Sequence, residues 1–198
     1  MSQLAREIGQ HGDVAEQRPQ SSRRRLLFTL PAFAFGGIAA ALIAGLGRDP
    51  RVVPSALVGR PVPSFALPPV PGRTLGLSSE NLVGEVSLVN VFASWCTACL
   101  EEHPIFMRLM RERVMPVHGL NYKDAPADAV AWLDKHGDPY MRTGSDRDGS
   151  IGIEWGVYGV PETYVVSRGG RIHHRQVGPV TEEIVARTIM PLVSELRR

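Results

Sequence analysis

The sequence predicts an α/β sandwich, in which a central mixed β-sheet is flanked by helices, with an N-terminal transmembrane helix ahead of it. Strand-like and helix-like hydrophobic patterns alternate from about residue 86 onward, and the chain ends with two closely spaced strand-like stretches and a helix-like one. An uncharged apolar stretch lies near the N-terminus. The length of 198 residues suits one folded domain together with this N-terminal apolar segment.

The N-terminal region divides into three parts by composition. Residues 1–25 are polar and rich in Gln, Ser and Arg, which predicts a disordered cytoplasmic tail. Residues 26–47 carry no charge, and about 20 such residues are enough for one helix to cross a hydrocarbon core. Residues 48–56 contain Pro50 and Pro54 and are typical of a linker. We therefore expect a transmembrane anchor at 26–47 and a folded domain at 57–198.

The charges on either side of the apolar stretch predict its orientation. Arginines at 23–25 directly precede it and only Arg48 and Arg51 follow closely, so the positive-inside rule favours a cytoplasmic N-terminus and an exported domain. The alternative is a cleaved signal peptide, because residues 39–41 are small. The apolar stretch is longer than the ~7–15 residues of a signal-peptide core, which favours the retained anchor.

The folded domain begins with a β-α-β-α pattern. The predicted elements are a buried strand at 86–92, a helix at 97–111, a strand at 114–122 and a helix from 124 to 137. Pro104 predicts a kink in the first helix, and Pro116 marks either the start of the second strand or a bulge in it. Asp124 is predicted as the N-cap of the second helix, and Gly137 as its end.

The C-terminal part of the domain is predicted to form a short helix, a hairpin and a final helix. The short helix covers 150–155, and strands at 163–166 and 171–177 flank a loop with two glycines, which indicates a β-hairpin. Thr181 is predicted to cap the last helix, which bends at Pro191.

The two cysteines of the chain, Cys96 and Cys99, carry its most informative motif. A spacing of three on the first turn of a helix places both sulfurs on one face, at a separation that a disulfide can bridge. The helix N-terminus stabilises a thiolate, so Cys96 is the predicted nucleophile and Cys99 the resolving thiol. Because the motif follows a buried strand and opens a helix, it predicts thiol:disulfide redox chemistry on a thioredoxin-like fold.

Other interpretations of this region are less favoured. A structural disulfide closing so small a loop adds little stability, and a lone C-x-x-C lacks the further ligands of a zinc site. His103 is a possible ligand, but a solvent-facing helix residue is the preferred interpretation. The segment 146–149 has too few ligands for a calcium loop. No metal and no cofactor beyond the redox-active disulfide are expected, and a net charge of +2 does not indicate nucleic-acid binding.

Pro161 lies in the Gly-Val-Pro-Glu-Thr segment just before the predicted hairpin. In thioredoxin-like folds a cis proline at this point faces the dithiol and leaves the preceding backbone free to pair with a substrate strand. We expect Pro161 in that role, the alternative being an ordinary trans proline that starts a strand.

Asn90 lies six residues before Cys96, where ordinary thioredoxins place a buried aspartate that handles protons for the resolving cysteine. Asparagine cannot titrate. Proton transfer then falls to water or to a nearby carboxylate, for which the candidates are Glu101, Glu102 and Glu162. Their alternative role is that of ordinary solvated side chains.

Four stretches together resemble the cytochrome c biogenesis thiol:disulfide interchange proteins, the DsbE/CcmG family. They are LVGRPVPSFAL, NVFASWCTACLEEHP, GLNYKDAPADAVAWLDKHGDPY and GVYGVPETYVVSRGGRIHHRQVGP, and the similarity runs from Leu57 to the C-terminus. Family members have acidic active-site surroundings, and Glu102 and Glu162 stand at the matching positions. Thr97 replaces the proline that usually follows the first cysteine, which leaves the redox potential open.

The resemblance implies a single-pass protein of the bacterial inner membrane with its catalytic domain in the periplasm. Its partners would be apocytochrome c, or an intermediary thiol protein, and a membrane thiol reductase that supplies electrons. It would keep the haem-binding cysteines of apocytochrome c reduced. The alternatives are a general envelope thiol reductant with other clients and, least favoured, a carrier that holds copper(I) or zinc on Cys96 and Cys99.

Overall fold

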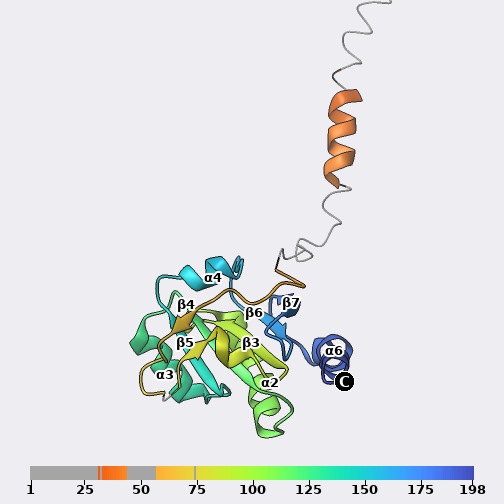
Figure 1. Ribbon diagram of the computed structural model, residues 1–198. Helices are drawn as coiled ribbons and strands as arrows, with labels where there is room; N and C mark the ends of the chain where they lie inside the picture. The colour runs from red at the N-terminus through yellow and green to blue at the C-terminus, as the bar shows by residue number, and fades with distance from the viewer. Residues whose placement is uncertain (1–30, 32, 44–56, 74) are drawn as a thin grey trace, which may run out of the picture. The chain divides into compact units, whose positions relative to one another are not determined.

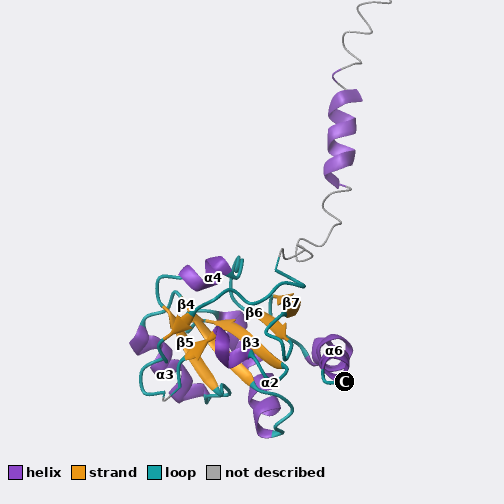
Figure 2. Ribbon diagram, viewed as in Figure 1, coloured by secondary structure: helices purple, strands orange, loops and turns teal. Residues whose placement is uncertain are grey.

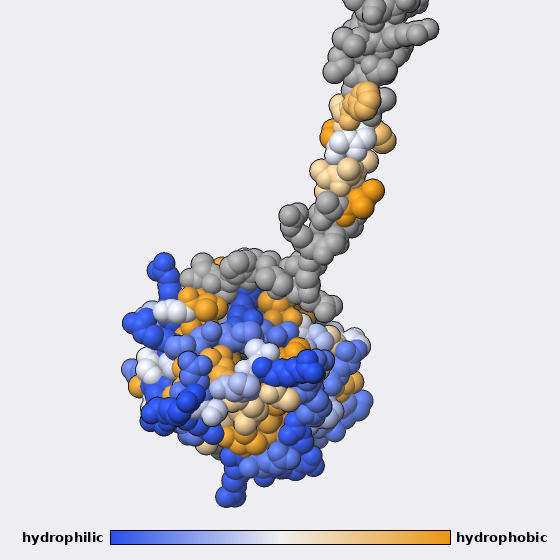
Figure 3. Space-filling model, turned by 90° about the vertical axis from the view of Figure 1, so that its right-hand side faces the viewer, coloured by the Kyte–Doolittle hydropathy of each residue, from blue (hydrophilic) through white to orange (hydrophobic). Residues whose placement is uncertain are grey.

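The computed structural model describes residues 31, 33–43, 57–73 and 75–198. Two units separate in it, residues 1–50 and 51–198. In the first unit residues 33–43 are helical, and Figure 3 shows their largely hydrophobic surface. None of the helices within the described ranges is both long and apolar enough to cross a membrane. The predicted tail at 1–25, the linker at 48–56 and residues 26–30, 32 and 44–47 of the predicted anchor lie outside the described residues.

The second unit is built on a five-stranded mixed sheet with the order β5-β4-β3-β6-β7 (Figure 1). Its strands are β3 (Ser87–Phe92), β4 (Val117–Tyr122), β5 (Arg142–Asp146), β6 (Glu162–Val166) and β7 (Ile172–Val177). Strands β3, β4 and β5 run parallel, whereas β6 pairs antiparallel with β3 and β7 antiparallel with β6. The predicted mixed sheet is confirmed.

The helices and short elements surround this sheet (Figure 2). They are β1 (Ala66–Leu67), β2 (Leu77–Ser78), the 3₁₀ turn η1 (Ser79–Leu82), α2 (Thr97–Arg111), α3 (Pro126–His136), α4 (Ser150–Glu154), α5 (Glu182–Ile184), the π-helical segment η2 (Val185–Ile189) and α6 (Met190–Leu196). Apolar side chains of α2, α3, η2 and α6 form one core cluster, and the segment before η1 contributes to another together with residues after α4.

The central strand β3 is buried along its whole length and is mainly apolar, with Ser87 and Asn90 as its polar residues. All six of its residues are buried, because α2 and α3 cover one face of the sheet, and residues 57–82 together with residues 151–157 cover the other. Leu88 and Phe92 belong to the cluster with the helices, and Val89 and Val91 to the cluster on the opposite face. Asn90 shares the face of Leu88 and Phe92, because side chains alternate along a strand.

Most of the predicted elements are confirmed, with two corrections. Helix α2 has the predicted bounds, with Pro104 inside it, and β6 and β7 form the predicted hairpin. The N-cap of α3 is Ala125, so the prediction that Asp124 caps this helix is wrong. Strand β5 was not predicted, because its sequence Arg-Thr-Gly-Ser-Asp contains no apolar residue.

Candidate active site at the start of helix α2

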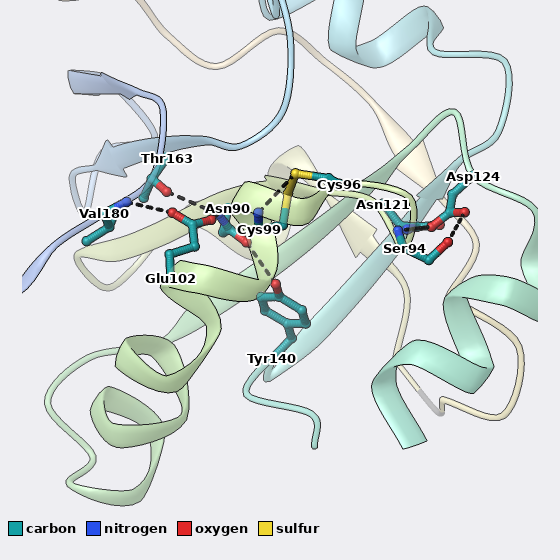
Figure 4. The surroundings of a disulfide bond; sticks show 10 residues. All are labelled: Asn90, Ser94, Cys96, Cys99, Glu102, Asn121, Asp124, Tyr140, Thr163 and Val180. Atoms are coloured by element: carbon teal, nitrogen blue, oxygen red, sulfur yellow. Dashed lines mark hydrogen bonds between the residues drawn. A yellow bond between two sulfur atoms is a disulfide. The ribbon is translucent and has the colours of Figure 1, made fainter. Parts of the chain in front are cut away.

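Cys96 and Cys99 lie where the central strand passes into the first long helix (Figure 4). They form a disulfide with an S–S distance of 2.11 Å and a Cα–Cα distance of 5.3 Å. Cys96 is the N-cap of α2, and its Sγ accepts a hydrogen bond from the backbone N–H of Cys99 at 3.0 Å. Cys96 therefore lies, as predicted, at the N-terminus of a helix, where the backbone N–H groups favour a thiolate.

The turn before Cys96 is held by the end of strand β4. Asp124 accepts hydrogen bonds from the backbone N–H and the hydroxyl of Ser94, both at 2.6 Å, and from Asn121 at 2.8 Å. The indole N–H of Trp95 donates to the carbonyl of Lys123 at 3.1 Å. Ser94 and Asp124 are 30 positions apart and meet because β3 and β4 pair in parallel. The sequence does not show this contact, and Asp124 was therefore predicted to be a helix cap.

Glu102 lies one turn after Cys99 on α2 and is 1% exposed. Its Oε1 accepts from Asn90 Nδ2 at 2.7 Å, and its Oε2 accepts from the backbone N–H of Val180 at 2.7 Å. Burial raises the pKa of this carboxyl to about 7, although both hydrogen bonds act in the opposite direction. Glu102 is thus a carboxyl that can exchange a proton near neutral pH, on the helix face that carries Cys99.

Asn90 connects Glu102 to two hydroxyl groups. Its Nδ2 also donates to Thr163 Oγ1 at 3.1 Å, and its Oδ1 accepts from the hydroxyl of Tyr140 at 2.7 Å. The ring of Tyr140 stacks on Phe92 with centroids 4.7 Å apart. Tyr140 was not singled out in the sequence, since its loop is 50 residues from Asn90.

Glu162 is buried on the opposite face of the sheet from Glu102. Strand register pairs it with Val91, one position from the Asn90–Thr163 pair, so alternation turns its side chain the other way. The Arg175 guanidinium binds both of its oxygens, at 2.8 and 2.7 Å, and the Tyr164 hydroxyl and the backbone N–H of Tyr158 also donate to it. These contacts leave Glu162 suited to holding the loop before Pro161.

Pro161 follows a cis peptide bond. Its carbonyl accepts from the backbone N–H of Gly178 at 3.0 Å, and the preceding Val160 packs against the core cluster that contains both cysteines. Trp95 and Tyr158 are 59% and 75% exposed. The cis proline segment and the dithiol therefore adjoin the same core cluster, with aromatic side chains open to solvent beside each.

His103, Glu101 and the segment 146–149 were also considered in the sequence, and none of them contacts the disulfide. His103 is buried, with Nε2 3.0 Å from the Gly137 carbonyl and its ring edge-on to Trp132, so the prediction of a solvent-facing side chain is wrong. Glu101 is exposed. Asp148 accepts from the backbone N–H of Ser150 and Asp146 from those of Ile151 and Gly152, which gives the 146–149 segment a capping role at the start of α4.

A family model, curated relatives and solved structures are similar to this chain. The Redoxin family model matches residues 57–189. The thiol:disulfide interchange protein DsbE of Allochromatium vinosum is 44% identical over 88% of this chain and 94% of its own length, and DsbE of Pseudomonas aeruginosa is 40% identical over 87% and 96%. A solved DsbE-like structure from Chlorobium tepidum superposes with a TM-score of 0.58 at 24% identity, over 67% of this chain and 95% of that one.

A thioredoxin-like sheet that carries a disulfide between Cys96 and Cys99 at a helix N-terminus defines a thiol:disulfide oxidoreductase. The identity to the curated relatives, maintained over most of the chain, is more specific than the fold. The chain belongs to the DsbE family of thiol:disulfide interchange proteins.

The buried Glu102 carboxyl predicts a pH-dependent stability difference. The pKa of Glu102 is raised from 4.5 to about 7 in the folded protein. Its contribution to the free energy of unfolding is therefore full below pH 4.5 and is lost as the pH rises through 7. Between pH 5 and pH 8 the oxidised protein should lose about 2 kcal/mol of unfolding free energy relative to Glu102→Gln. Urea unfolding of both proteins at the two pH values measures this difference, and parallel pH curves would contradict it.

Proposed function

We propose that this protein is a periplasmic reductant of cytochrome c maturation, anchored in the bacterial inner membrane by its N-terminal apolar segment. The Cys96–Cys99 disulfide, in a chain that is 44% identical to a DsbE protein over 174 residues, carries this proposal. The uncharged stretch at 26–47 and the arginines ahead of it support the anchor and its orientation. Its clients are the haem-binding cysteines of apocytochrome c, directly or through an intermediary thiol protein.

Reduction of a client proceeds by two thiol–disulfide exchanges. The Cys96 thiolate attacks one sulfur of the client disulfide, and the other client sulfur leaves as a thiolate. Glu102 takes the proton of the Cys99 thiol, and the Cys99 thiolate attacks Sγ of Cys96 and releases the second client sulfur. The client gains two electrons and this protein becomes the Cys96–Cys99 disulfide, which a membrane thiol reductase must reduce again.

An extended client segment is proposed to pair with the backbone before Pro161. Within the described part of the chain, neither the N–H nor the carbonyl of Val160 has a backbone hydrogen bond. Unpaired backbone groups at the end of a sheet are a template for an added strand. Such pairing places the client next to Cys96, and exposed Trp95 and Tyr158 offer apolar contacts on either side.

Two measurements test this function. Equilibration with glutathione or dithiothreitol should give a reduction potential near the ~−270 mV of the reducing thioredoxins, whereas a value near the ~−120 mV of strong oxidants would make the protein a disulfide donor. A deletion strain should lose haem attachment to c-type cytochromes, and the full chain but not Cys96→Ser should restore it. Normal cytochromes together with other misoxidised envelope proteins would instead identify a general envelope reductant.

A further inference from the structure

Four arginines gather at the end of the sheet that is opposite to the disulfide. The carboxyl end of β3 leads to Cys96. Strand β6 runs antiparallel to β3, so the loop from β6 to β7 lies at the other end of the sheet. This loop, the segment before β1 and the end of α6 supply the four residues, which we call the arginine surface: Arg60, Arg168, Arg171 and Arg197. The first three are exposed and the last is partly exposed.

Hydrogen bonds to backbone carbonyls hold these side chains in place. Arg171 Nη1 donates to the carbonyl of Gly59 at 3.0 Å. Arg168 Nη2 donates to the carbonyl of Arg197 at 2.8 Å, and Arg197 Nη2 donates to the carbonyl of Val114 at 2.8 Å. A guanidinium has five N–H donors, so each of these bonds leaves most of the donors of its arginine for another ligand.

The positive charge of the arginine surface is largely uncompensated within the part of the chain that the structure describes. There, its single carboxylate contact runs from Arg197 to Glu85 at 3.9 Å. By contrast, Arg73 and Arg175 have carboxylate oxygens at 2.6 and 2.7 Å. Guanidinium groups without a close carboxylate are suited to phosphate groups, which they bind through two parallel N–H donors.

Two exposed valines lie among these arginines. Val83 is 60% exposed, and its side chain lies against Gly170 of the loop between β6 and β7. Val58 is 46% exposed and directly precedes Gly59, whose N–H donates to the carbonyl of Ile172 at 2.7 Å. Arginines combined with exposed aliphatic side chains fit a membrane surface, where lipid phosphates bind the cations and apolar side chains enter the boundary of the acyl chains.

The chain enters the domain at the arginine surface. Residues 59 and 60 exchange backbone hydrogen bonds with Ile172 at the start of β7. The sequence 48–56 ahead of the domain can span at most about 30 Å, and Arg51 adds a further positive charge to it. An anchor at 26–47 would therefore hold the arginine surface within reach of lipid headgroups and raise their effective concentration there.

We propose that the arginine surface docks the domain on the anionic phospholipid headgroups of the membrane that holds its anchor. This inference rests on the anchor of the proposed function and adds an orientation to it. The Cys96–Cys99 disulfide lies at the opposite end of the sheet, so the docked domain turns it away from the bilayer. Each arginine close to an anionic membrane surface should change the ratio of docked to undocked domain about fivefold.

The test measures the exposure of two nitroxide spin labels, each on the oxidised full chain in lipid nanodiscs. The native cysteines are disulfide-bonded and do not react with the label. Gly169→Cys carries one label next to Arg168, where the structure has open space for a side chain. Ile153→Cys carries the control label at an exposed position of α4. Nanodiscs of phosphatidylcholine alone are compared with nanodiscs of equal parts phosphatidylcholine and phosphatidylglycerol.

In the anionic nanodiscs the label at position 169 should lose most of its contact with a neutral nickel chelate in the water, while the label at position 153 keeps it. Arg168→Gln combined with Arg171→Gln should lower the docked ratio about 25-fold and restore the contact, although each glutamine retains an N–H donor for the backbone. Arg147→Gln combined with Arg187→Gln removes the same charge outside the arginine surface and should leave position 169 protected. Salt at ~1 M should remove the protection, because the Debye length falls to ~3 Å.

The outcomes separate this inference from the proposed anchor. Equal exposure of position 169 in the two kinds of nanodisc, or protection that survives Arg168→Gln with Arg171→Gln, would overturn the docking. A full chain that stays in the neutral nanodiscs without protection of position 169 in the anionic ones keeps the anchor and loses the docking. A chain that binds only the anionic nanodiscs, with position 169 protected, would remove the anchor and support the docking.

Discussion

Replacement of Cys99 by serine is expected to stop the reaction after its first step. Reduced Cys99→Ser, mixed with a peptide that carries one disulfide, should form a stable mixed disulfide through Cys96, because no second thiol can displace the peptide. Release of the reduced peptide should fall at least ~10³-fold, as when one member of a catalytic group that acts as a unit is removed. Intact-mass measurement under single-turnover conditions identifies the adduct.

The matched control for this experiment is Cys96→Ser. Its remaining thiol is Cys99, which is 2% exposed and lies behind Cys96 at the start of α2. Cys96→Ser should therefore form neither the adduct nor the reduced peptide. An adduct that appears with Cys96→Ser instead of Cys99→Ser would reverse the assigned order of the two cysteines.

Local patterns were sufficient to predict the region that carries the dithiol. The mainly apolar strand β3, the C-x-x-C motif and the helix over Thr97–Arg111 follow one another closely in sequence, and each follows a rule of burial, capping or periodicity. The hairpin of β6 and β7 follows from its glycine loop in the same way. The sequence alone therefore predicts this part of the fold without knowledge of tertiary contacts.

The elements that were missed depend on tertiary contacts. Strand β5 contains no large apolar side chain, and at Gly144 there is no room for one, because a Cβ there would lie 2.9 Å from the Leu67 side chain. Its place in the sheet comes from pairing with β4 and from that close approach. His103 also has an ordinary helix position in the sequence, and the end of α3 buries it. No local pattern records such contacts.

The two glutamates flanking the site illustrate the same limit. The sequence groups Glu102 and Glu162 as possible proton carriers, since both lie close to functional motifs. The register of β3 and β6 puts them on opposite faces of the sheet, and Arg175 occupies the carboxylate of Glu162. Glu102 has no cationic partner among the groups that shift its pKa. The difference between a proton carrier and a structural ion pair is therefore set by strand register.

Loss of the Arg175 side chain is expected to cost much of the stability of the domain. Arg175 and Glu162 have side chains that are 3% and 1% exposed, so Arg175→Leu leaves a buried carboxylate without its counter-charge. Removing one partner of such a pair costs about 3–5 kcal/mol. Urea unfolding at pH 7 of the oxidised protein measures this loss. The Arg175→Leu protein should also bind a client peptide more weakly, because Arg175 stacks on Tyr158 with a cation–ring distance of 4.7 Å.

A double variant distinguishes the buried charge from lost packing. Glu162→Gln combined with Arg175→Leu removes both charges, and the introduced glutamine amide retains an acceptor for the backbone N–H of Tyr158. The double variant should therefore be more stable than Arg175→Leu alone, by about half of the loss or more. Equal unfolding free energies for the single and double variants would mean that Arg175 acts through its packing against Tyr158, and the loop before Pro161 would then depend on that contact more than on the ion pair.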